Sequence, residues 1–345
     1  MKKKVLVTGG TGYIGSHTVV ELQNEGFEAI IIDNLSNSDI KVLEGIHKIT
    51  GSKPVFEQID LRNTDRLEAF FSLNPDIDAI IHFAAFKAVG ESVEKPLLYY
   101  HNNLLSLIHL LQSMKSFNIP SMVFSSSCTV YGQPAELPVS EEAPVQTALS
   151  PYGNTKRAGE EIIKDTVHSC AELKAISLRY FNPIGAHPSS HIGELPAGVP
   201  DNLVPFITQT AAGIRDELLV FGDDYNTPDG SCIRDFIHVS DLAKAHVTAL
   251  KRLLDGKNKE NYEVFNLGTG KGVSVFEAIE SFERVTGKKL NYRVSDRRPG
   301  DIEKIWADPS LANNELGWSH TRSLDDAMKS AWDWEKAYRN INNKK

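Results

Sequence analysis

The sequence predicts an α/β fold, a doubly wound parallel sheet with a smaller, interleaved C-terminal lobe. Two observations support this prediction. Short apolar runs alternate with helix-length stretches as far as Tyr180, and a glycine-rich turn directly follows the first run. Strands separated by helices pair in parallel through right-handed crossovers, which place helices on both faces of the sheet. The 345 residues exceed one typical domain, so we expect two lobes with a cleft between them.

The expected strands are apolar runs over residues 4–8, 29–33, 55–60, 79–84, 121–126 and 175–180. The following segment, residues 182–202, is rich in Gly, Pro, His and Ser, which is typical of a loop that leaves the sheet. Residues 236–239 and 264–267 again have strand character, and we expect them to return to the sheet.

The composition disfavours several classes of protein. Hydrophobic residues make up 41% and charged residues 24%, an ordinary globular balance. A net charge of −8 disfavours a nucleic-acid binder, which needs a basic face. No apolar run approaches the roughly 18 residues that span a bilayer, and the first run is too short for a signal peptide. The 3 cysteines lack a C-x-x-C spacing and fit a reducing compartment. We expect a cytoplasmic protein that binds neither nucleic acid nor membrane.

Histidine spacing gives no indication of a metal site. The 11 histidines include His82, His187 and His238, and none has a second ligand at a metal-like spacing. We interpret these three as packing or hydrogen-bonding residues and expect no metal.

The strongest local signal is the G-x-x-G-x-x-G turn made by Gly9, Gly12 and Gly15, which opens a helix towards Asn24. Glycines let the backbone approach a pyrophosphate, and the positive end of the helix binds its charge. The motif alone is also compatible with a plain structural turn. Its place between a first strand and a helix favours a dinucleotide site in a Rossmann-type domain.

Acidic residues at strand ends indicate which dinucleotide binds. Asp33 ends the second expected strand, where a carboxylate accepts hydrogen bonds from the adenosine ribose and repels a 2′-phosphate. Asn34 beside it is not basic, so the sequence predicts NAD rather than NADP. Asp60, at the end of the third strand, is a second candidate near the adenine, and a simple turn residue is almost equally compatible.

Tyr152 and Lys156 follow Pro151 at the start of a helix, with an i, i+4 spacing that places them on one face. A free tyrosine has a pKa of about 10. A nearby ammonium and an oxidised nicotinamide both favour the phenolate, which makes the tyrosine a usable base. A lone Y-x-x-x-K also occurs often by chance.

A hydroxyl-rich strand end supports the catalytic interpretation. Ser125, Ser126 and Ser127 end the strand that precedes the helix, and such hydroxyls can hydrogen-bond both a substrate alcohol and the tyrosine. Ser127 is the predicted catalytic serine. Ser125 and Ser126 are better explained as residues that satisfy backbone groups.

These motifs, residues 9–15, 125–132 and 152–156, resemble the extended short-chain dehydrogenase/reductase family. Five further segments narrow the resemblance to its UDP-glucose 4-epimerases along nearly the whole chain: residues 82–92, 179–188, 234–239, 266–268 and 297–301. The resemblance implies a cytoplasmic homodimer that interconverts UDP-glucose and UDP-galactose in galactose metabolism. C4 is oxidised to a 4-keto-hexose, which rotates and is reduced on its opposite face.

The resemblance also implies ligand contacts, position by position. Around NAD it places Tyr13, Ile14, Asp33, Asn34, Asp60, Leu61, Phe83, Ala84, Lys87, Asn102, Tyr152, Lys156 and Tyr180. Around the UDP-hexose it places Ser127, Tyr152, Asn182, Asn202, Leu203, Phe221, Arg234, Arg298, Asp301 and Ile305. Two arginines suit a diphosphate because each offers a planar fork of donors. Without the resemblance, Arg234 and Arg298 are ordinary surface ion-pair residues.

Two rival functions are weaker. A sugar-nucleotide 4,6-dehydratase carries an acidic pair just after the strand hydroxyl, where this chain has Cys128 and Thr129. A non-catalytic NAD-sensing regulator would be expected to lose Tyr152, Lys156 or Ser127, and all three are present.

Ile305 bears on substrate range. In similar epimerases a tyrosine here accompanies narrow specificity, and a small residue accompanies acceptance of N-acetylated sugars. Isoleucine is smaller than tyrosine but branched and stiff. We expect weaker activity on UDP-N-acetylglucosamine; the alternative is that Ile305 merely packs.

The predicted domains follow from these assignments. Residues 1–182, joined by residues 236–272, form the NAD-binding Rossmann domain. Residues 183–235 and 273–340 form the UDP-sugar-binding lobe.

Overall fold

The computed structural model describes residues 2–196, 198–298 and 301–341. Pro299 and Gly300, within the predicted motif at residues 297–301, lie outside this range. The elements, in chain order, are β1 (Lys4–Thr8), α1 (Tyr13–Asn24), β2 (Glu28–Asp33), α2 (Val42–Thr50), β3 (Val55–Gln58), α3 (Thr64–Leu73), β4 (Ile77–His82), α4 (Val89–Glu94), α5 (Pro96–Ser116), β5 (Ser121–Ser125), η1 (Cys128–Tyr131), α6 (Pro151–Ser169), β6 (Lys174–Tyr180), β7 (Asn182–Ile184), α7 (Leu203–Ala211), β8 (Leu218–Phe221), β9 (Ile233–Arg234), β10 (Phe236–His238), α8 (Val239–Leu254), β11 (Tyr262–Leu267), β12 (Val273–Ser274), α9 (Val275–Thr286), β13 (Tyr292–Ser295), η2 (Ala312–Leu316) and α10 (Leu324–Tyr338).

Seven parallel strands form the central sheet in the order β11-β6-β5-β4-β1-β2-β3. The strand order reverses direction at β1: the chain places β2 and β3 on one side of β1, and β4, β5, β6 and β11 on the other side. Helices α1, α2 and α8 cover one face, and α3, α5 and α6 cover the other. This is the doubly wound, Rossmann-type sheet that the sequence predicts. Its strand-order reversal places the ligand crevice at the carboxyl ends of the strands.

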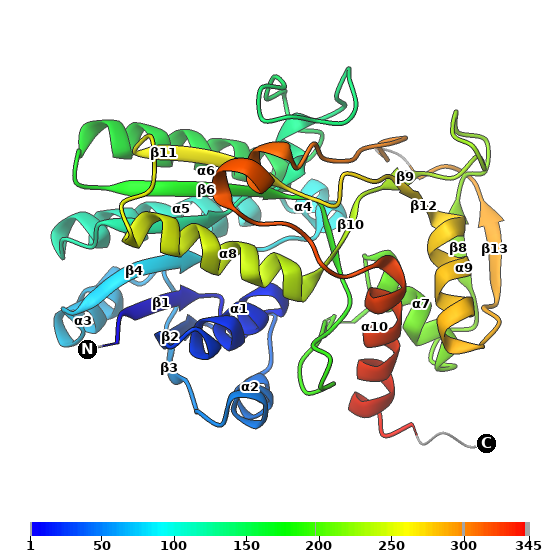
Figure 1. Cartoon of the computed structure of the whole chain (residues 1–345), viewed down its shortest axis with the longest axis horizontal. Coiled ribbons are helices and arrows are strands. Elements are labelled where there is room, and N and C mark those ends of the chain that lie inside the picture. Colours follow the sequence, from blue (N-terminus) through cyan, green and yellow to red (C-terminus); the bar gives the residue numbers. More distant parts are fainter. Residues whose placement is uncertain (1, 197, 299–300, 342–345) are drawn as a thin grey trace.

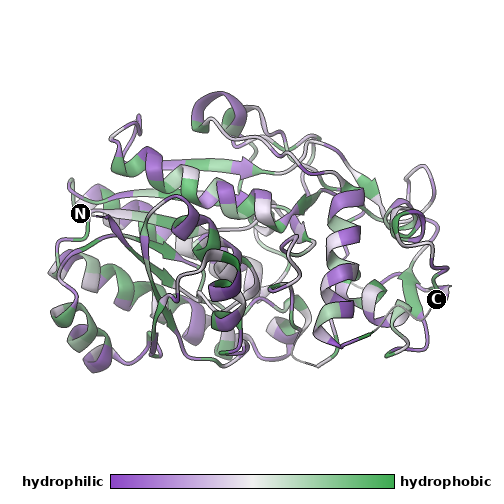
Figure 2. Ribbon diagram, turned by 60° about the horizontal axis from the view of Figure 1, so that its bottom comes forward, coloured by the Kyte–Doolittle hydropathy of each residue, from purple (hydrophilic) through white to green (hydrophobic). Residues whose placement is uncertain are grey.

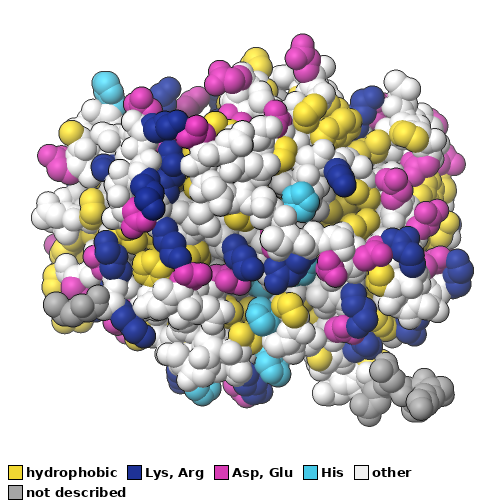
Figure 3. All heavy atoms as spheres, in the orientation of Figure 1, with side chains coloured by type: hydrophobic (Ala, Val, Ile, Leu, Met, Phe, Trp, Pro, Cys, Tyr) yellow, Lys and Arg dark blue, Asp and Glu magenta, His cyan; other side chains and the backbone are white. Residues whose placement is uncertain are grey.

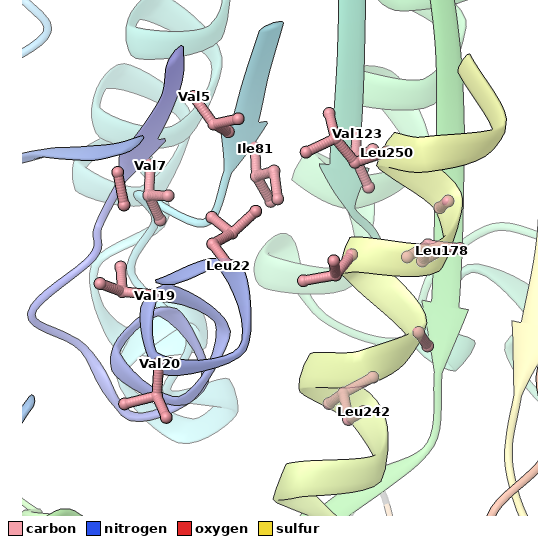
Figure 4. Close-up of a cluster of buried hydrophobic side chains, with 14 of the residues drawn as sticks. Val5, Val7, Val19, Val20, Leu22, Ile81, Val123, Leu178, Leu242 and Leu250 are labelled. Carbon is pink, nitrogen blue, oxygen red and sulfur yellow. The ribbon is translucent and has the colours of Figure 1, made fainter. Parts of the chain in front are cut away.

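Apolar residues on both sides of each strand explain the burial of the sheet. In β1, Val5 and Val7 face the core layer under α1 and α8, whereas Leu6 belongs to the opposite layer. Figure 4 shows Val5 and Val7 directed towards α1, near Leu22. Burial of one such side chain contributes about 1.5–3 kcal/mol.

Most of the predicted strands are confirmed, with shifted ends. The third strand stops at Gln58; Ile59 still donates its N–H to the Asp33 carbonyl at 3.2 Å, and the chain turns at Leu61 and Arg62. Residues 264–267 do return to the sheet, as part of β11 at its edge. The prediction that residues 236–239 return there is wrong. β7 continues from β6 beyond the sheet, and β10 pairs with this extension in a separate two-stranded sheet.

The rest of the chain forms a smaller body beyond the carboxyl ends of the strands (Figure 1). It has its own apolar core, to which α7, α9, α10 and β8 contribute. Its strands pair as β8 with β13 and as β9 with β12. The domain boundaries given above stay a prediction.

The surface matches the composition. In Figure 2 apolar segments concentrate in the sheet and on the inner sides of the helices. On the face drawn in Figure 3, acidic and basic side chains are interspersed. Among the described residues, no helix combines the length and apolar character needed to cross a bilayer.

Candidate active site

The glycine turn packs tightly against the end of β4. Gly9 has a left-handed φ of +70°, and a Cβ atom there would lie 2.7 Å from the Ala84 nitrogen. A Cβ atom at Gly15 would lie 2.3 Å from the Gly9 carbonyl oxygen. Only glycine fits these positions, and α1 begins directly behind the turn with Gly12 as its N-cap. The first N–H groups of a helix lack intrahelical partners, so the turn presents donors and a positive helix end to an anion.

Asp33 is buried beside this turn, at the end of β2. Its carboxylate accepts hydrogen bonds from the backbone nitrogens of Thr11 at 3.3 Å and Leu35 at 2.9 Å, and from the Ser38 hydroxyl at 3.2 Å. A glycine cradle next to a fixed carboxylate has the donor and acceptor arrangement that a dinucleotide needs. The chain's own residues therefore fit NAD.

Asp60 is engaged by neighbouring side chains. Arg62 binds both of its oxygens, at 2.9 and 2.6 Å, and Asn34 donates to it at 3.1 Å. Hydrogen bonding to Arg62 is the main cause that holds the pKa of Asp60 well below its usual range. This geometry agrees with the turn-residue alternative.

The other residues predicted around NAD come mostly from the same edge of the sheet: Tyr13, Ile14, Leu61, Phe83, Ala84, Lys87, Asn102 and Tyr180. Leu61 differs from the other residues in this set, because its side chain is buried in the core layer under α3 and α5. The Tyr180 hydroxyl forms a hydrogen bond with Ser125 Oγ at 2.8 Å. Lys87 Nζ lies 5.9 Å from the centroid of the Tyr13 ring, directly at the glycine turn.

Tyr152 and Lys156 lie in the first turns of α6. Ser150 caps this helix by accepting from the Gly153 nitrogen at 3.1 Å, and Pro151 occupies its first position. Both side chains are buried, and Lys156 Nζ lies 6.0 Å from the Tyr152 ring centroid. Lys156 Nζ also donates to the Ser125 carbonyl at 2.5 Å. The helix and the end of β5 therefore meet at this point.

The electrostatics of this pair follow from burial. Burial raises the pKa of Tyr152 well above its usual value, whereas hydrogen bonding by Ser127 lowers it. Burial lowers the pKa of Lys156 to about 8, and the charge of Glu160 opposes this shift. Lys156 is therefore mainly an ammonium at neutral pH. The protein alone keeps the phenol protonated, and positive charge near it favours the phenolate.

The three serines at the end of β5 have different hydrogen-bond partners. Ser127 caps η1 by accepting from the Thr129 nitrogen at 3.2 Å, which orients its hydroxyl beside Tyr152. Ser126 Oγ donates to Glu160 at 2.5 Å, and Ser125 bonds Tyr180. The hydroxyls of Ser125 and Ser126 thus bond side chains of β6 and α6, and not the backbone groups that the sequence analysis expected.

A buried ion pair that was not predicted from the sequence lies behind this site. Glu160 accepts two parallel hydrogen bonds from Arg179, from Nε at 2.9 Å and from Nη2 at 2.6 Å. Arg179 Nη1 also donates to the Tyr131 hydroxyl at 2.9 Å. Glu160 follows Lys156 by one helical turn, so extension of the i, i+4 pattern along α6 was the signal that could have found it.

Asn103 was missed as well. Its Oδ1 accepts from the Phe86 nitrogen at 2.8 Å, and its Nδ2 donates to the Phe86 carbonyl and the Thr155 hydroxyl, each at 3.0 Å. It therefore joins the loop after β4 to the catalytic helix. A buried amide in the middle of α5 has no distinguishing sequence pattern.

On the opposite side, four of the residues predicted around the UDP-hexose lie together. Arg298 binds Asp301 through Nη2 at 2.7 Å and Nε at 3.2 Å, and Arg234 approaches the same carboxylate at 3.8 Å. The Arg298 guanidinium lies 5.5 Å from the centroid of the Phe221 ring, which is partly exposed at the end of β8. Two guanidinium groups and an aromatic face suit a diphosphate and a flat base.

The remaining substrate-side residues are spread along this wall. Asn202 occupies the N-cap position of α7, Leu203 packs against the core of the smaller body, and Asn182 begins β7. Ile305 is only 2% exposed and packs in an apolar cluster with Phe181 and Val130. Cys128, next to Ser127 in the sequence, packs against the same cluster.

Histidines near the site act through packing or hydrogen bonds. His82 Nδ1 bonds the Thr8 hydroxyl at 2.7 Å, and His238 Nε2 lies 3.2 Å from Ser330 Oγ. Across the described ranges, no group of three or more His, Cys, Asp or Glu side chains has an arrangement that could hold a metal ion.

Comparison with known proteins agrees with this geometry. The model of the NAD dependent epimerase/dehydratase family matches residues 5–268. A UDP-glucose 4-epimerase of Arabidopsis thaliana is 49% identical over 337 residues, covering 97% of this chain and 95% of the relative.

Two solved structures are similar along their whole length. The UDP-glucose 4-epimerase of Stenotrophomonas maltophila, with bound NAD and formylated UDP-arabinopyranose, has a TM-score of 0.94 and 47% identity, covering 99% of this chain and 100% of that one. The enzyme of Bifidobacterium longum, in complex with NAD+ and UDP, has a TM-score of 0.93 and 46% identity, covering 98% and 99%. The chain therefore belongs to the NAD-dependent epimerase/dehydratase family, in which its relatives over nearly the full length are UDP-glucose 4-epimerases.

Proposed function

We propose that this protein interconverts UDP-glucose and UDP-galactose with NAD as a bound prosthetic group. The observation that carries the proposal is the meeting of Tyr152, Lys156 and Ser127 at the carboxyl edge of the sheet, between the glycine turn and the Arg234–Arg298 pair. The full-length similarity to enzymes of this name supports the same reaction.

Each of these residues has a chemical task in the proposal. NAD, when bound, supplies an acceptor and donor of hydride for C4 and a positive charge beside the site. Tyr152 removes the proton from the C4 hydroxyl and later returns it, with Ser127 as hydrogen-bond partner of the same oxygen. Lys156 stays positively charged and stabilises the phenolate. The glycine turn holds the pyrophosphate of the dinucleotide, and Asp33 holds its adenosine ribose.

Inversion at C4 requires tight binding of one part of the substrate and freedom of movement for another part. The diphosphate must stay bound while the 4-keto-hexose turns its other face towards the nicotinamide. Arg234 and Arg298 provide a charged clamp for the diphosphate, with Phe221 against the uracil, and Asn182, Asn202, Leu203 and Asp301 complete this wall. The family resemblance assigns Ile305 to the pocket in which the sugar would turn, and on that basis we propose weaker activity on UDP-N-acetylglucosamine.

The reaction can be tested directly. Purified protein mixed with UDP-glucose should yield UDP-galactose without added cofactor, and nucleotide released by denaturation should be NAD or NADH by mass spectrometry. Release of chiefly NADP would contradict the role of Asp33. Accumulation of a 4-keto-6-deoxy sugar would instead favour the dehydratase alternative, against which the Cys128-Thr129 pair argues.

The assembly is proposed to be a homodimer in the cytoplasm. Val93 and Leu97, on α4 and α5, are 61% and 81% exposed and give that side of the molecule an apolar surface. Light scattering on the purified protein should give twice the 38.2 kDa chain mass. A monomer at micromolar concentration would contradict the dimer and leave the catalytic proposal intact.

A further inference from the structure

One carboxylate lies between the two walls of the site. Glu194 belongs to the segment between β7 and α7, and its Oε1 accepts hydrogen bonds from Lys87 Nζ and from Asn202 Nδ2, each at 2.9 Å. Lys87 follows the end of β4 at the glycine turn, and Asn202 occupies the N-cap position of α7, where its side chain makes no capping hydrogen bond. The Glu194 side chain is 11% exposed and the Lys87 side chain 55%, so the carboxylate is withdrawn from water while the ammonium stays partly solvated.

The backbone that carries Glu194 is held from two directions. Trp334 on α10 donates from its indole nitrogen to the Glu194 carbonyl at 3.1 Å. Gly193 lies so close to this ring that a Cβ atom would stand 2.5 Å from Trp334 Cγ. On the other side, a Cβ atom at Gly45 of α2 would lie 2.3 Å from the His191 carbonyl oxygen. Packing against α2 and α10 therefore sets the position of the carboxylate.

Contacts around Tyr13 place this carboxylate at the cofactor turn. The Tyr13 hydroxyl donates to the Gly185 carbonyl at 2.6 Å, and Lys87 Nζ stands 5.9 Å from the centroid of the Tyr13 ring. After burial, the charge of Glu194 is the next cause that raises the pKa of Tyr13. Glu194, Lys87 and Tyr13 thus form one local group at the start of α1.

We infer that Glu194 is a positioning residue that couples the cofactor site to the substrate site. It holds the Lys87 ammonium at the glycine turn and, through the same oxygen, fixes which edge of the Asn202 amide faces the crevice. Because Nδ2 donates to Glu194, Oδ1 of Asn202 is turned away from this contact. The inference rests on the proposed function, since the ligand roles of Lys87 and Asn202 come from the family resemblance.

Coupling of this kind is expected to be moderate and reciprocal. Energetic coupling between two binding sites commonly changes an affinity by about 5- to 150-fold. Glu194→Ala should therefore weaken UDP binding to the NAD-loaded protein by about 5- to 20-fold. It should also release NAD several times faster, because Lys87 loses the acceptor that orients it.

Double-variant cycles test whether Glu194 acts through its two partners. UDP affinity is measured by calorimetry on the NAD-loaded protein in wild type, Glu194→Ala, Asn202→Ala and the double variant. NAD release is followed by dilution in the matching set with Lys87→Ala. We expect Glu194→Ala to have less than about a twofold further effect once its partner is absent. Glu194→Gln, which keeps an oxygen acceptor for Asn202, should bring UDP affinity back to within about twofold of wild type.

Glu44→Ala is the matched control. Glu44 pairs with Lys48 on the exposed surface of α2 at 2.8 Å. Its loss should change neither UDP affinity nor the rate of NAD release. Equal effects of Glu194→Ala with and without Asn202 and Lys87, or unchanged binding of both ligands in Glu194→Ala, would overturn the coupling. Turnover of UDP-glucose by wild type is measured alongside: its absence overturns the proposed function, whereas normal turnover with additive effects overturns only the role of Glu194.

Discussion

The two walls of the crevice are built in different ways. On the cofactor wall, Asp33, Tyr152 and Lys156 are 7%, 8% and 5% exposed and are held by caps and backbone contacts. On the substrate wall, the Arg298 side chain is 53% exposed and is held mainly by Asp301. Proton transfer needs groups in fixed positions, whereas rotation of a keto-sugar needs room. The difference suggests that the cofactor wall sets the chemical step and the substrate wall sets retention of UDP.

The largest expected effect is the loss of turnover when the proposed proton-transferring group of the cofactor wall is removed. Tyr152→Phe removes the proton-transferring hydroxyl and keeps the ring, so the protein should fold and retain NAD. Its kcat should fall by about 10²- to 10⁴-fold. Steady-state assays with UDP-glucose, with circular dichroism as the control for folding, measure this. Near-normal turnover by the folded variant would remove Tyr152 from the mechanism.

The buried Glu160–Arg179 pair lies behind the cofactor wall, and its removal tests how much this pair contributes to the free energy of unfolding. Glu160→Ala leaves the Arg179 guanidinium buried without its carboxylate, which should lower the free energy of unfolding by about 3–5 kcal/mol. Urea denaturation gives this value. Glu217→Ala removes the partner of the exposed Arg293 and serves as a control that should change stability little. Similar small losses in both variants would contradict the role assigned to the pair.

A buried histidine makes the cofactor wall sensitive to acid. His246 packs 4.6 Å from the Phe83 ring, and burial lowers its pKa to about 4. The unfolded histidine has a pKa of about 6.5, so between these values the unfolded chain binds more protons and stability falls as pH falls. The free energy of unfolding of wild type, relative to His246→Leu, should drop by roughly 3 kcal/mol from pH 7 to pH 4. A difference that stays constant over this range would contradict the prediction.

On the substrate wall we expect changes in binding rather than in stability. Arg298→Leu should raise KM for UDP-glucose about 10- to 100-fold with a smaller change in kcat, because it removes a charge-assisted contact with the diphosphate. The adjacent Arg297 pairs with Asp224 at 2.6 Å, and Arg297→Leu is the matched control. If both variants raise KM equally, the effect is general electrostatics and Arg298 is not a specific clamp.

The smallest effect concerns the space in which the sugar turns. Ile305→Tyr should abolish the weak activity on UDP-N-acetylglucosamine. Ile305→Gly should raise this activity by a few-fold relative to UDP-glucose, which is less than the roughly 10- to 200-fold that a pocket methylene can contribute. Coupled assays on both substrates decide this. If wild type has no such activity and neither substitution changes the ratio, Ile305 only packs in its apolar cluster.

The residues of the cofactor wall could be predicted from local sequence patterns, whereas those of the substrate wall could not. The glycine turn, Asp33 and the Tyr152–Lys156 spacing are local patterns, because each function depends on residues within one strand-turn-helix unit. Arg234 and Arg298 could be assigned only through the family resemblance, since they are far apart in sequence and resemble ordinary surface residues. The structure brings them to one carboxylate, Asp301.

By itself, the sequence determined the parallel sheet, the cofactor turn and the catalytic helix, because alternation of strands and helices and i, i+4 spacing are properties of short segments. Tertiary structure decided which distant groups meet. Pairing of β10 with β7, the Glu160–Arg179 pair and the contact of Glu194 with both Lys87 and Asn202 all join segments whose packing no local pattern specifies. Burial also decided the pKa of Lys156, because removal from water depends on the whole surrounding fold.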